Sequence, residues 1–266
     1  MNMRERYGPW AVIAGGSEGV GSAFAHQLAA NGISLVLLAR NAAALEATAA
    51  AVRAAHGVEV RTLSLDLASE TMLDTIRSVT DGLDVGTLIY NAGAATGPVP
   101  LIDQPTEQAL TNIRVNVIGQ TLLSQHFGRQ MVARGRGRGA IILVGSLGAI
   151  AGCKNLAVYA AVKSYTQTFA EGLWAEMAPH GVNAAALMIG RTRTPALERT
   201  ELHENTGVPT AEPDDVVAYA LAHLADGPVL VPPEHQKSFE AMRAMPRRKA
   251  VEIMTRSLEP QTKDLM

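Results

Sequence analysis

A serine, a tyrosine and a lysine occur together in the stretch SLGAIAGCKNLAVYAAVK, which runs from Ser146 to Lys163. Tyr159 and Lys163 are four residues apart, so on a helix they project from one face and the ammonium can lie beside the phenol. A free phenol has a pKa of about 10, and a neighbouring cation favours the phenolate and lowers that pKa. We therefore expect Tyr159 to donate and accept a proton, with its pKa lowered by Lys163, as carbonyl reduction requires. Ser146 supplies a hydroxyl from the end of the preceding strand.

A glycine-rich turn near the N-terminus has the composition of a dinucleotide-binding site. Gly15, Gly19 and Gly21 lie in AGGSEGVGSAF, where a short apolar run changes into a helical pattern. Glycines allow the backbone to approach a pyrophosphate, and the N–H groups of a helix N-terminus favour its negative charge. The alternative is a tight strand-to-helix turn that binds nothing. The position of the turn at the first strand–helix junction favours a cofactor site.

The elements that position these residues alternate along the chain. Apolar runs of strand length are separated by alanine-rich stretches of helical length, which is typical of βαβ units around a parallel sheet. We expect seven strands, at residues 11–15, 35–39, 58–65, 87–90, 140–146, 182–189 and 229–231. We expect six helices, at about 19–31, 41–56, 69–80, 106–134, 155–179 and 213–225.

Right-handed crossovers between these elements predict one α/β domain over residues 1–266, a Rossmann-type, doubly wound parallel sheet of about seven strands flanked by helices. Ligands of such sheets bind at the carboxyl ends of the strands. The residues with useful chemistry all follow strand ends, because Gly15, Asn91, Ser146 and Gly190 come after the first, fourth, fifth and sixth strands. We expect them to meet at one edge of the sheet.

Taken together, these motifs resemble the short-chain dehydrogenase/reductase family in its single-domain form, over nearly the whole chain. That family carries TGxxxGxG at the first turn, NAG after the fourth strand, an asparagine in the next long helix, and a serine followed by YxxxK. The matching residues are Ala14 to Gly21, Asn91-Ala92-Gly93, Asn116 in VNVIG, Ser146, Tyr159 and Lys163. The resemblance implies an oxidoreductase that transfers a hydride between a nicotinamide cofactor and a ketone or secondary alcohol.

The resemblance also implies a role for each matching residue. Asn116, Ser146, Tyr159 and Lys163 would be catalytic: Tyr159 transfers the proton, Ser146 stabilises the substrate oxygen, and Asn116 holds a water that links Lys163 to solvent. The cofactor-binding residues would be Gly15, Ser17, Glu18, Gly19, Val20, Gly21, Arg40, Asp66, Leu67, Asn91, Ala92, Gly93, Tyr159, Lys163, Ile189, Gly190, Thr192 and Thr194. Each residue alone also has a purely structural interpretation, such as an amphipathic pair, a strand terminus or a buried amide.

Two positions depart from the family pattern. Ala14 replaces a threonine whose hydroxyl could bond to the NAG segment, and we expect a small effect on stability. Ile189 replaces the proline of a PG motif, so only Gly190 and the threonine at the end of RTRT remain of that motif.

NADP(H) is the favoured cofactor, with NAD(H) possible. An acid at the end of the second strand would bond the adenine ribose, whereas a base there would accept a 2′-phosphate. The residues present are Ala39, Arg40 and Asn41, and an arginine can bond phosphate and stack on adenine. Glu18 in the glycine turn favours NAD(H) instead, because several members of the family that prefer NADP carry a basic residue there. Asp66 resembles an adenine-contacting acid of the family but could instead cap the next helix.

The surrounding segments predict a fairly apolar substrate. Residues 191–212 form a long polar connection of the kind that acts as a lid, with Leu197 facing the pocket. Residues 95–101 with Leu147, Ile150 and Cys153 would line the remaining walls. Cys153 reads as a small apolar filler and not as a nucleophile. Residues 233–266 predict one or two amphipathic helices that cover the pocket or build an interface.

Composition excludes several other classes of partner. The 266 residues are 47% hydrophobic and 18% charged, and the formal charge of −2 does not favour nucleic acid or anionic membranes. We expect no membrane segment, and no metal site because no histidine joins a cysteine cluster or an H-x-x-x-H pair. The single cysteine favours a reducing, cytoplasmic compartment. RGRGRG at Arg134 to Gly139 reads as a basic turn. A homodimer or homotetramer is expected from the resemblance.

Three alternatives stay open at this point. An epimerase or dehydratase of the same fold would have a longer chain and a G-x-x-G-x-x-G turn, and an enoyl reductase would place six residues between tyrosine and lysine. A noncatalytic NAD(P)-binding redox sensor belongs to a different class. Sensors of this kind often lose the tyrosine or the lysine, and both are present here.

Overall fold

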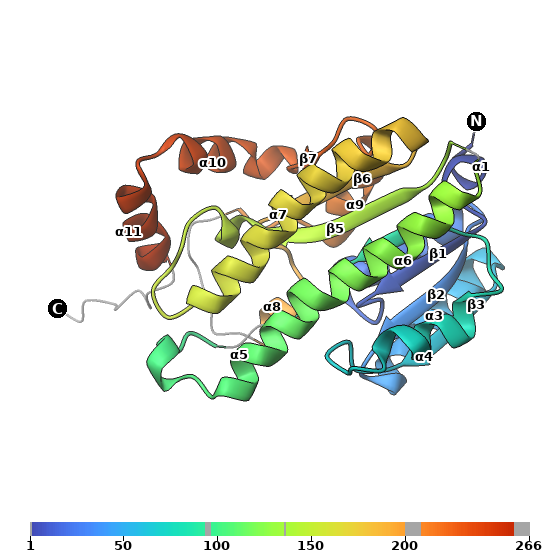
Figure 1. The fold of residues 1–266 in the computed structure, drawn as a ribbon, viewed down its shortest axis with the longest axis horizontal. Helices are drawn as coiled ribbons and strands as arrows, with labels where there is room; N and C mark the ends of the chain where they lie inside the picture. Colours follow the sequence, from blue (N-terminus) through green and yellow to red (C-terminus); the bar gives the residue numbers. More distant parts are fainter. Residues whose placement is uncertain (1, 94–96, 136, 200–208, 258–266) are drawn as a thin grey trace.

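The computed structural model describes residues 2–93, 97–135, 137–199 and 209–257. A seven-stranded parallel sheet runs through the middle of the molecule, with strand order β3-β2-β1-β4-β5-β6-β7 (Figure 1). The predicted fold class is confirmed. The strands are β1 (Trp10–Ala14), β2 (Ser34–Ala39), β3 (Val60–Ser64), β4 (Val85–Tyr90), β5 (Ala140–Ser146), β6 (Asn183–Ile189) and β7 (Val229–Leu230).

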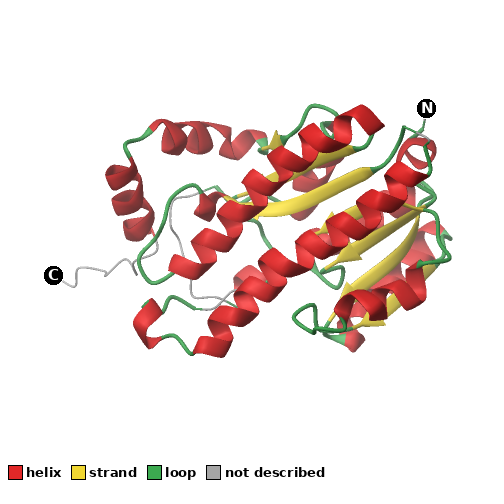
Figure 2. Cartoon of the chain, in the orientation of Figure 1, coloured by secondary structure: helices red, strands yellow, loops and turns green. Residues whose placement is uncertain are grey.

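Helices cover both faces of the sheet, which is why its central strands are apolar in most positions and not only in alternate ones. All six residues of β4 are buried. On one face the core is built by α2 (Gly19–Ala30), α3 (Ala42–His56) and α9 (Pro213–Ala222). On the other face it is built by α4 (Met72–Thr80), α6 (Gln120–Ala133) and α7 (Ala157–Met177). Figure 2 shows α6 and α7 lying in front of the sheet.

The helix predicted at residues 106–134 is present over residues 106–133, but it is not α-helical throughout. The chain forms α5 (Thr106–Ile113), then a π-helical segment η2 (Arg114–Gly119), and only then α6. A π-turn inserts an extra residue per turn and commonly marks a functional site. Here it contains Asn116.

Smaller elements complete the fold. The sequence did not predict α1 (Met3–Tyr7), whose first turn is closed by a capping box between Asn2 and Glu5. Short helical turns lie at η1 (Leu101–Asp103), η3 (Leu147–Ala149), η4 (Ala178–His180) and α8 (Pro195–Glu198). The C-terminal segment forms two helices, α10 (Pro233–Ala244) and α11 (Arg247–Ser257). No helix among the described residues is both long and apolar enough to span a membrane.

Candidate active site

The predicted site residues gather at the carboxyl edge of the sheet. All strands run in one direction, so the residues that follow β1, β4, β5 and β6 meet at the same edge (Figure 1). Ser146 and Ile189 are register partners at the ends of β5 and β6. Ala14 and Tyr90 are register partners at the ends of β1 and β4. The expected convergence is therefore present in the backbone.

The glycine turn is packed directly against the NAG segment. Gly15 has φ +81°, and a Cβ there would lie 2.7 Å from the backbone nitrogen of Ala92. A Cβ on Gly21 would collide with the carbonyl of Gly15, which accepts a hydrogen bond from Asn91 Nδ2 at 2.9 Å. The backbone N–H groups of Asn91 and Ala92 both donate to Ala14 O, at 2.9 and 2.8 Å. The two segments are thus joined through the backbone, although Ala14 lacks the threonine hydroxyl.

Ser146 and Tyr159 form the proton-handling pair. The side chains of the two residues are hydrogen-bonded to each other, and Ser146 Oγ also accepts a bond from the Gly148 N–H at 3.1 Å. Burial raises the pKa of Tyr159, and the bond with Ser146 lowers it only in part. The prediction that Lys163 lowers this pKa is wrong here, because loss of phenolate hydration dominates.

Lys163 is a buried cation on the same helix. Its Nζ donates to Val144 O at 3.3 Å, and burial lowers the pKa of the ammonium to about 8. The space beside Gly93 brings it together with Asn116: a Cβ on Gly93 would lie 3.2 Å from Lys163 Nζ and 3.3 Å from Asn116 Oδ1. Glycine at this position leaves room for both polar groups.

Asn116 is held in place by the π-turn. Its Nδ2 donates to Asn112 O at 3.0 Å, and the side chain is buried. Tyr90 donates its hydroxyl to Val115 O at 2.6 Å, and a Cβ on Gly119 would collide with that hydroxyl. Tyr90 and Gly119 are therefore positioning residues that the sequence analysis missed. The available signals were the tyrosine before NAG and the glycine within VNVIG.

Arg40 and Asp66 lie at the ends of β2 and β3, beside the first turn. The guanidinium of Arg40 is exposed and makes no bond within the described part of the chain, while its carbonyl accepts a bond from Ser64 Oγ at 3.0 Å. One Asp66 oxygen accepts from the Ala68 N–H at 2.9 Å. Asp66 thus closes a local turn and does not cap α4, which begins at Met72. Leu67 beside it is buried.

The rest of the glycine turn contacts the segment after β6. Glu18 forms an ion pair with Arg199, and the side chain of Thr194 packs against Gly19, where an added Cβ on the glycine would lie 2.8 Å from Thr194 Cγ2. Thr194 Oγ1 accepts from the Leu197 N–H at 3.2 Å and so begins α8. Val20 is buried at the start of α2, and the Ser17 carbonyl accepts a bond from Thr48 at 2.8 Å.

Beneath this segment lies His235, which the sequence analysis also missed. A Cβ on Gly190 would lie 2.6 Å from the imidazole, so the ring packs flat against this backbone. Burial lowers the pKa of His235 and favours the neutral ring. Thr192 is buried and donates to Gly190 O at 3.3 Å, and it pairs with Ala211 across a short bridge. The two ends of the predicted lid are therefore tied together, while residues 200–208 lie outside the described part.

Among the predicted wall residues, Cys153 is buried and Leu147 and Ile150 are partly buried beside the core. Burial raises the pKa of the Cys153 thiol, which favours the neutral, unreactive form. Residues 94–96 of the opposite wall and residues 258–266 of the C-terminal extension lie outside the described residues. In the described ranges no group of three or more metal-ligating side chains is found.

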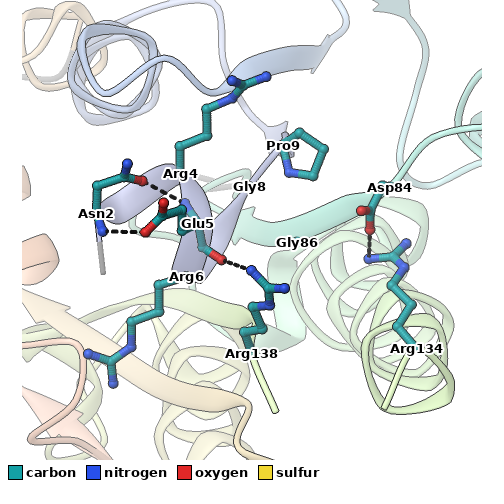
Figure 3. Close-up of a pocket in the computed structure, with 10 residues that line it drawn as sticks. All are labelled: Asn2, Arg4, Glu5, Arg6, Gly8, Pro9, Asp84, Gly86, Arg134 and Arg138. Carbon is teal, nitrogen blue, oxygen red and sulfur yellow. Dashed lines mark hydrogen bonds and ion pairs between the residues drawn. The ribbon is translucent and has the colours of Figure 1, made fainter. Parts of the chain in front are cut away.

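A cavity of about 310 Å³ lies at the other edge of the sheet, by the amino ends of β1, β4 and β5 (Figure 3). It contains none of the predicted site residues. Arg134 pairs with Asp84 at 2.8 Å and donates to Val85 O at 2.6 Å, and Arg138 donates to Glu5 O at 2.5 Å. Arg138 thus ties the RGRGRG tract to α1 and Arg134 ties it to the start of β4, which agrees with its interpretation as a basic turn.

Comparison with known proteins places this geometry in context. The family model described as short chain dehydrogenase matches residues 9–205. A 7β-hydroxysteroid dehydrogenase of Clostridium sardiniense is 32% identical over 226 residues, which cover 84% of this chain and 85% of that enzyme. A very-long-chain 3-oxoacyl-CoA reductase of Aspergillus clavatus is 34% identical over 178 residues, or 66% of this chain. The chain spans only about half of that reductase, 51% of its length.

Solved structures show the same likeness. A structure from work on the stereoselectivity of 7β-hydroxysteroid dehydrogenase superposes with a TM-score of 0.89 at 28% identity, covering 96% of this chain and 99% of that one. A short-chain dehydrogenase of Sphingobium yanoikuyae, solved in complex with NADPH, superposes with a TM-score of 0.78 at 30% identity. That match covers 88% of this chain and 92% of the other.

Proposed function

The chain belongs to the short-chain dehydrogenase family, and from that membership we propose that it transfers a hydride between NADP(H) and a fairly apolar ketone or secondary alcohol. One observation carries the proposal: Tyr159 bonded to Ser146 lies on the same helix face as Lys163, which meets Asn116 beside Gly93. This arrangement supplies a proton donor, a group that stabilises an oxyanion, and a cation.

In reduction, Tyr159 gives its proton to the oxygen of the substrate carbonyl as that oxygen gains charge. Its raised pKa keeps the phenol protonated at neutral pH, which suits a donor. Ser146 donates a hydrogen bond to the same oxygen and so stabilises charge that develops mainly in the transition state. In oxidation the proton moves in the opposite direction. The bound cofactor supplies or accepts the hydride.

Lys163 and Asn116 support this proton transfer. The ammonium of Lys163 would bond the nicotinamide ribose and restore the proton of Tyr159, while Asn116 would hold a water that connects Lys163 to solvent. A lysine pKa of about 8 suits such a relay, because near neutral pH the ammonium can both release and regain a proton.

The glycine turn and the residues around it would hold the cofactor. Helix α2 begins at Gly19, so its first N–H groups are suited to a pyrophosphate. We favour NADP(H) over NAD(H) because the exposed Arg40 guanidinium, which has no partner in the described chain, can bond a 2′-phosphate. Glu18 is neutralised by Arg199, so its charge opposes a phosphate less than the sequence suggested. The NADPH complex of the Sphingobium enzyme supports this preference.

The substrate is proposed from the pocket walls and the relatives. Leu147, Ile150 and Cys153 make one wall apolar, and the relatives act, by their names, on hydroxysteroids and very-long-chain 3-oxoacyl thioesters. A bulky apolar ketone fits both observations. We also propose a homodimer or homotetramer and a cytoplasmic location.

The proposal is tested by following reduced nicotinamide with a panel of ketones and alcohols that includes a ketosteroid, a 3-oxoacyl thioester and a small aliphatic ketone, each with NADPH and with NADH. We expect turnover of a bulky ketone, faster with NADPH. Tyr159→Phe should lower kcat at least 1000-fold and leave NADPH binding unchanged, because the variant loses only the proton donor. NADPH binding without turnover of any compound would support the redox sensor instead.

A further inference from the structure

Helix α11 lies along the loop that connects Ser146 to Tyr159 (Figure 1). Arg247 Nη1 donates to Ile150 O at 2.8 Å, and the Lys154 N–H donates to Thr255 Oγ1 at 3.2 Å. The Cys153 thiol donates to Met254 O at 3.6 Å. These bonds come from both ends of the helix, so α11 contacts the loop along its length.

The helix is anchored and not loosely attached. Ala250 in its middle is fully buried, and two of the three bonds satisfy backbone groups of the loop, at Ile150 and Lys154. The loop that joins Ser146 to Tyr159 is therefore held from outside by the C-terminal helix. The sequence predicted helices in this segment but not which part of the site they would contact.

The charge of the two C-terminal helices differs from that of the whole chain. Residues 233–257 contain six basic side chains against three acidic ones, whereas the formal charge of the chain is −2. Arg248 is paired with Glu252 at 3.1 Å, and Arg243 lies over the Phe239 ring. Arg247 makes no ion pair in the part of the chain that the structure describes, and only its Nη1 is engaged. Its Nε and Nη2 remain as donors beside the loop.

Because Arg247 is bonded to Ile150, the length of the loop limits the distance between its guanidinium and Ser146. Ile150 is four residues after Ser146, so their Cα atoms are at most about 14 Å apart. A substrate whose carbonyl lies against Ser146 and Tyr159 can extend along the loop to this guanidinium. A planar guanidinium binds carboxylate or phosphate oxygens better than any neutral group.

We infer that Arg247 binds an anionic group of the substrate, so that the preferred ketone is an apolar molecule with a carboxylate or phosphate at its far end. This inference rests on the proposed function, because it concerns the substrate of that same site. Arg247 determines specificity and takes no part in the proton or hydride transfer.

The test compares a keto acid with its methyl ester, which has the same carbonyl and the same carbon skeleton but no charge. The measured quantity is the ratio of their kcat/KM values with NADPH, for the native protein and its variants. We expect the native protein to prefer the acid, and Arg247→Gln to lower the acid-to-ester ratio about tenfold or more through KM. Added salt should lower kcat/KM for the acid and leave the ester unchanged.

Two control variants separate charge from loop position. Arg248→Gln removes the same charge from the neighbouring residue, which is already paired, and should leave the ratio unchanged. Thr255→Val removes a loop bond without changing charge, so it should lower acid and ester turnover equally. A shift of the loop changes kcat/KM for acid and ester alike, so it cancels in the acid-to-ester ratio. An unchanged ratio in Arg247→Gln therefore overturns the inference about Arg247. Turnover of the ester would still support the proposed reductase activity. Absence of turnover with every ketone would contradict the proposed function itself.

Discussion

At the residue scale, the two titratable groups of the site are controlled by burial. Burial raises the pKa of Tyr159 and lowers the pKa of Lys163 to about 8, so both side chains are shifted toward their neutral forms. The sequence predicted the opposite shift for the tyrosine, because four-residue spacing indicates proximity but says nothing about hydration. The site therefore holds a neutral donor beside a cation that is costly to keep charged.

Lys163 should make the fold less stable than a neutral residue of similar size would. The pKa of this lysine falls from 10.5 in a solvated state to about 8 in the folded state, so unfolding takes up a proton between these values. The cost is fully present below about pH 8 and disappears as the pH rises through the solvated pKa. The difference between the two pKa values corresponds to a loss of folding stability on the order of 3 kcal/mol.

We therefore expect Lys163→Met to abolish turnover and to raise the free energy of unfolding at pH 7. Urea denaturation at pH 7 and near pH 10 measures the free energy of unfolding of both proteins. The excess stability of the variant over the native protein should be smaller at the higher pH. A variant less stable than the native protein at pH 7, or a difference independent of pH, would show that burial of the ammonium carries no such cost. The matched comparison is Lys154→Met, which removes an exposed lysine of the neighbouring loop.

At the scale of elements, the π-turn decides where Asn116 lies. The sequence pattern predicts one regular α-helix, and the extra residue in the π-turn changes the direction in which Asn116 faces. Tyr90 crosses from the end of β4 to bond Val115 O, and Gly119 leaves space for that ring. Gln120 then ties the start of α6 to Thr166 of α7 at 3.2 Å, which keeps Asn116 beside Lys163.

Gly119→Ala should therefore disturb catalysis as well as stability. The new methyl group collides with the Tyr90 hydroxyl, so we expect kcat to fall at least tenfold and the free energy of unfolding to fall by roughly 1–3 kcal/mol. Kinetics and urea denaturation measure the two effects. Tyr90→Phe in the same chain removes the colliding hydroxyl and should restore part of the lost stability.

A second glycine provides the control for that substitution. Gly172 lies in α7, and a Cβ there would meet nothing within 4 Å. Gly172→Ala should leave kcat unchanged and stabilise the helix by about 0.5–1 kcal/mol. If Gly119→Ala behaved like Gly172→Ala, the π-turn would not depend on the contact between Tyr90 and residue 119.

At the scale of the whole molecule, the exposed apolar side chains are unevenly distributed. Leu110, Ile113 and Ile118 lie on α5 and η2, and Trp174 lies on α7, which packs against both elements; each side chain is 38–47% exposed. Large apolar side chains exposed on neighbouring helices are more than isolated surface residues and indicate a protein interface. A second copy of the chain is the partner that the resemblance to the family implies.

Replacing Ile118 and Trp174 by glutamate should convert the expected dimer or tetramer into a monomer, since each places a charge on the shared face. Light scattering after size-exclusion chromatography measures the mass. Val251→Glu on α11 is the control, because that side chain is equally exposed but lies on another element. A native protein that is already monomeric would refute the predicted interface.

The local pattern of apolar residues and glycines in the sequence was sufficient to predict most of the fold. Apolar runs and glycine turns report on single strands and helices, and parallel order follows from their alternation, so the sheet and its carboxyl edge were predictable. The departures occurred where a helix is altered by a distant partner, as η2 is by Tyr90, or where an element such as α1 is too short to show a period.

For the candidate site, the sequence alone determined which residues meet, because the ends of parallel strands share an edge. Only the tertiary structure decided how they are held: the direction of the Tyr159 and Lys163 pKa shifts, the stacking of His235 on Gly190, and the contact of α11 with the loop before Tyr159. Each of these depends on burial or on contacts between residues far apart in the chain. Spacing along a sequence carries no record of either.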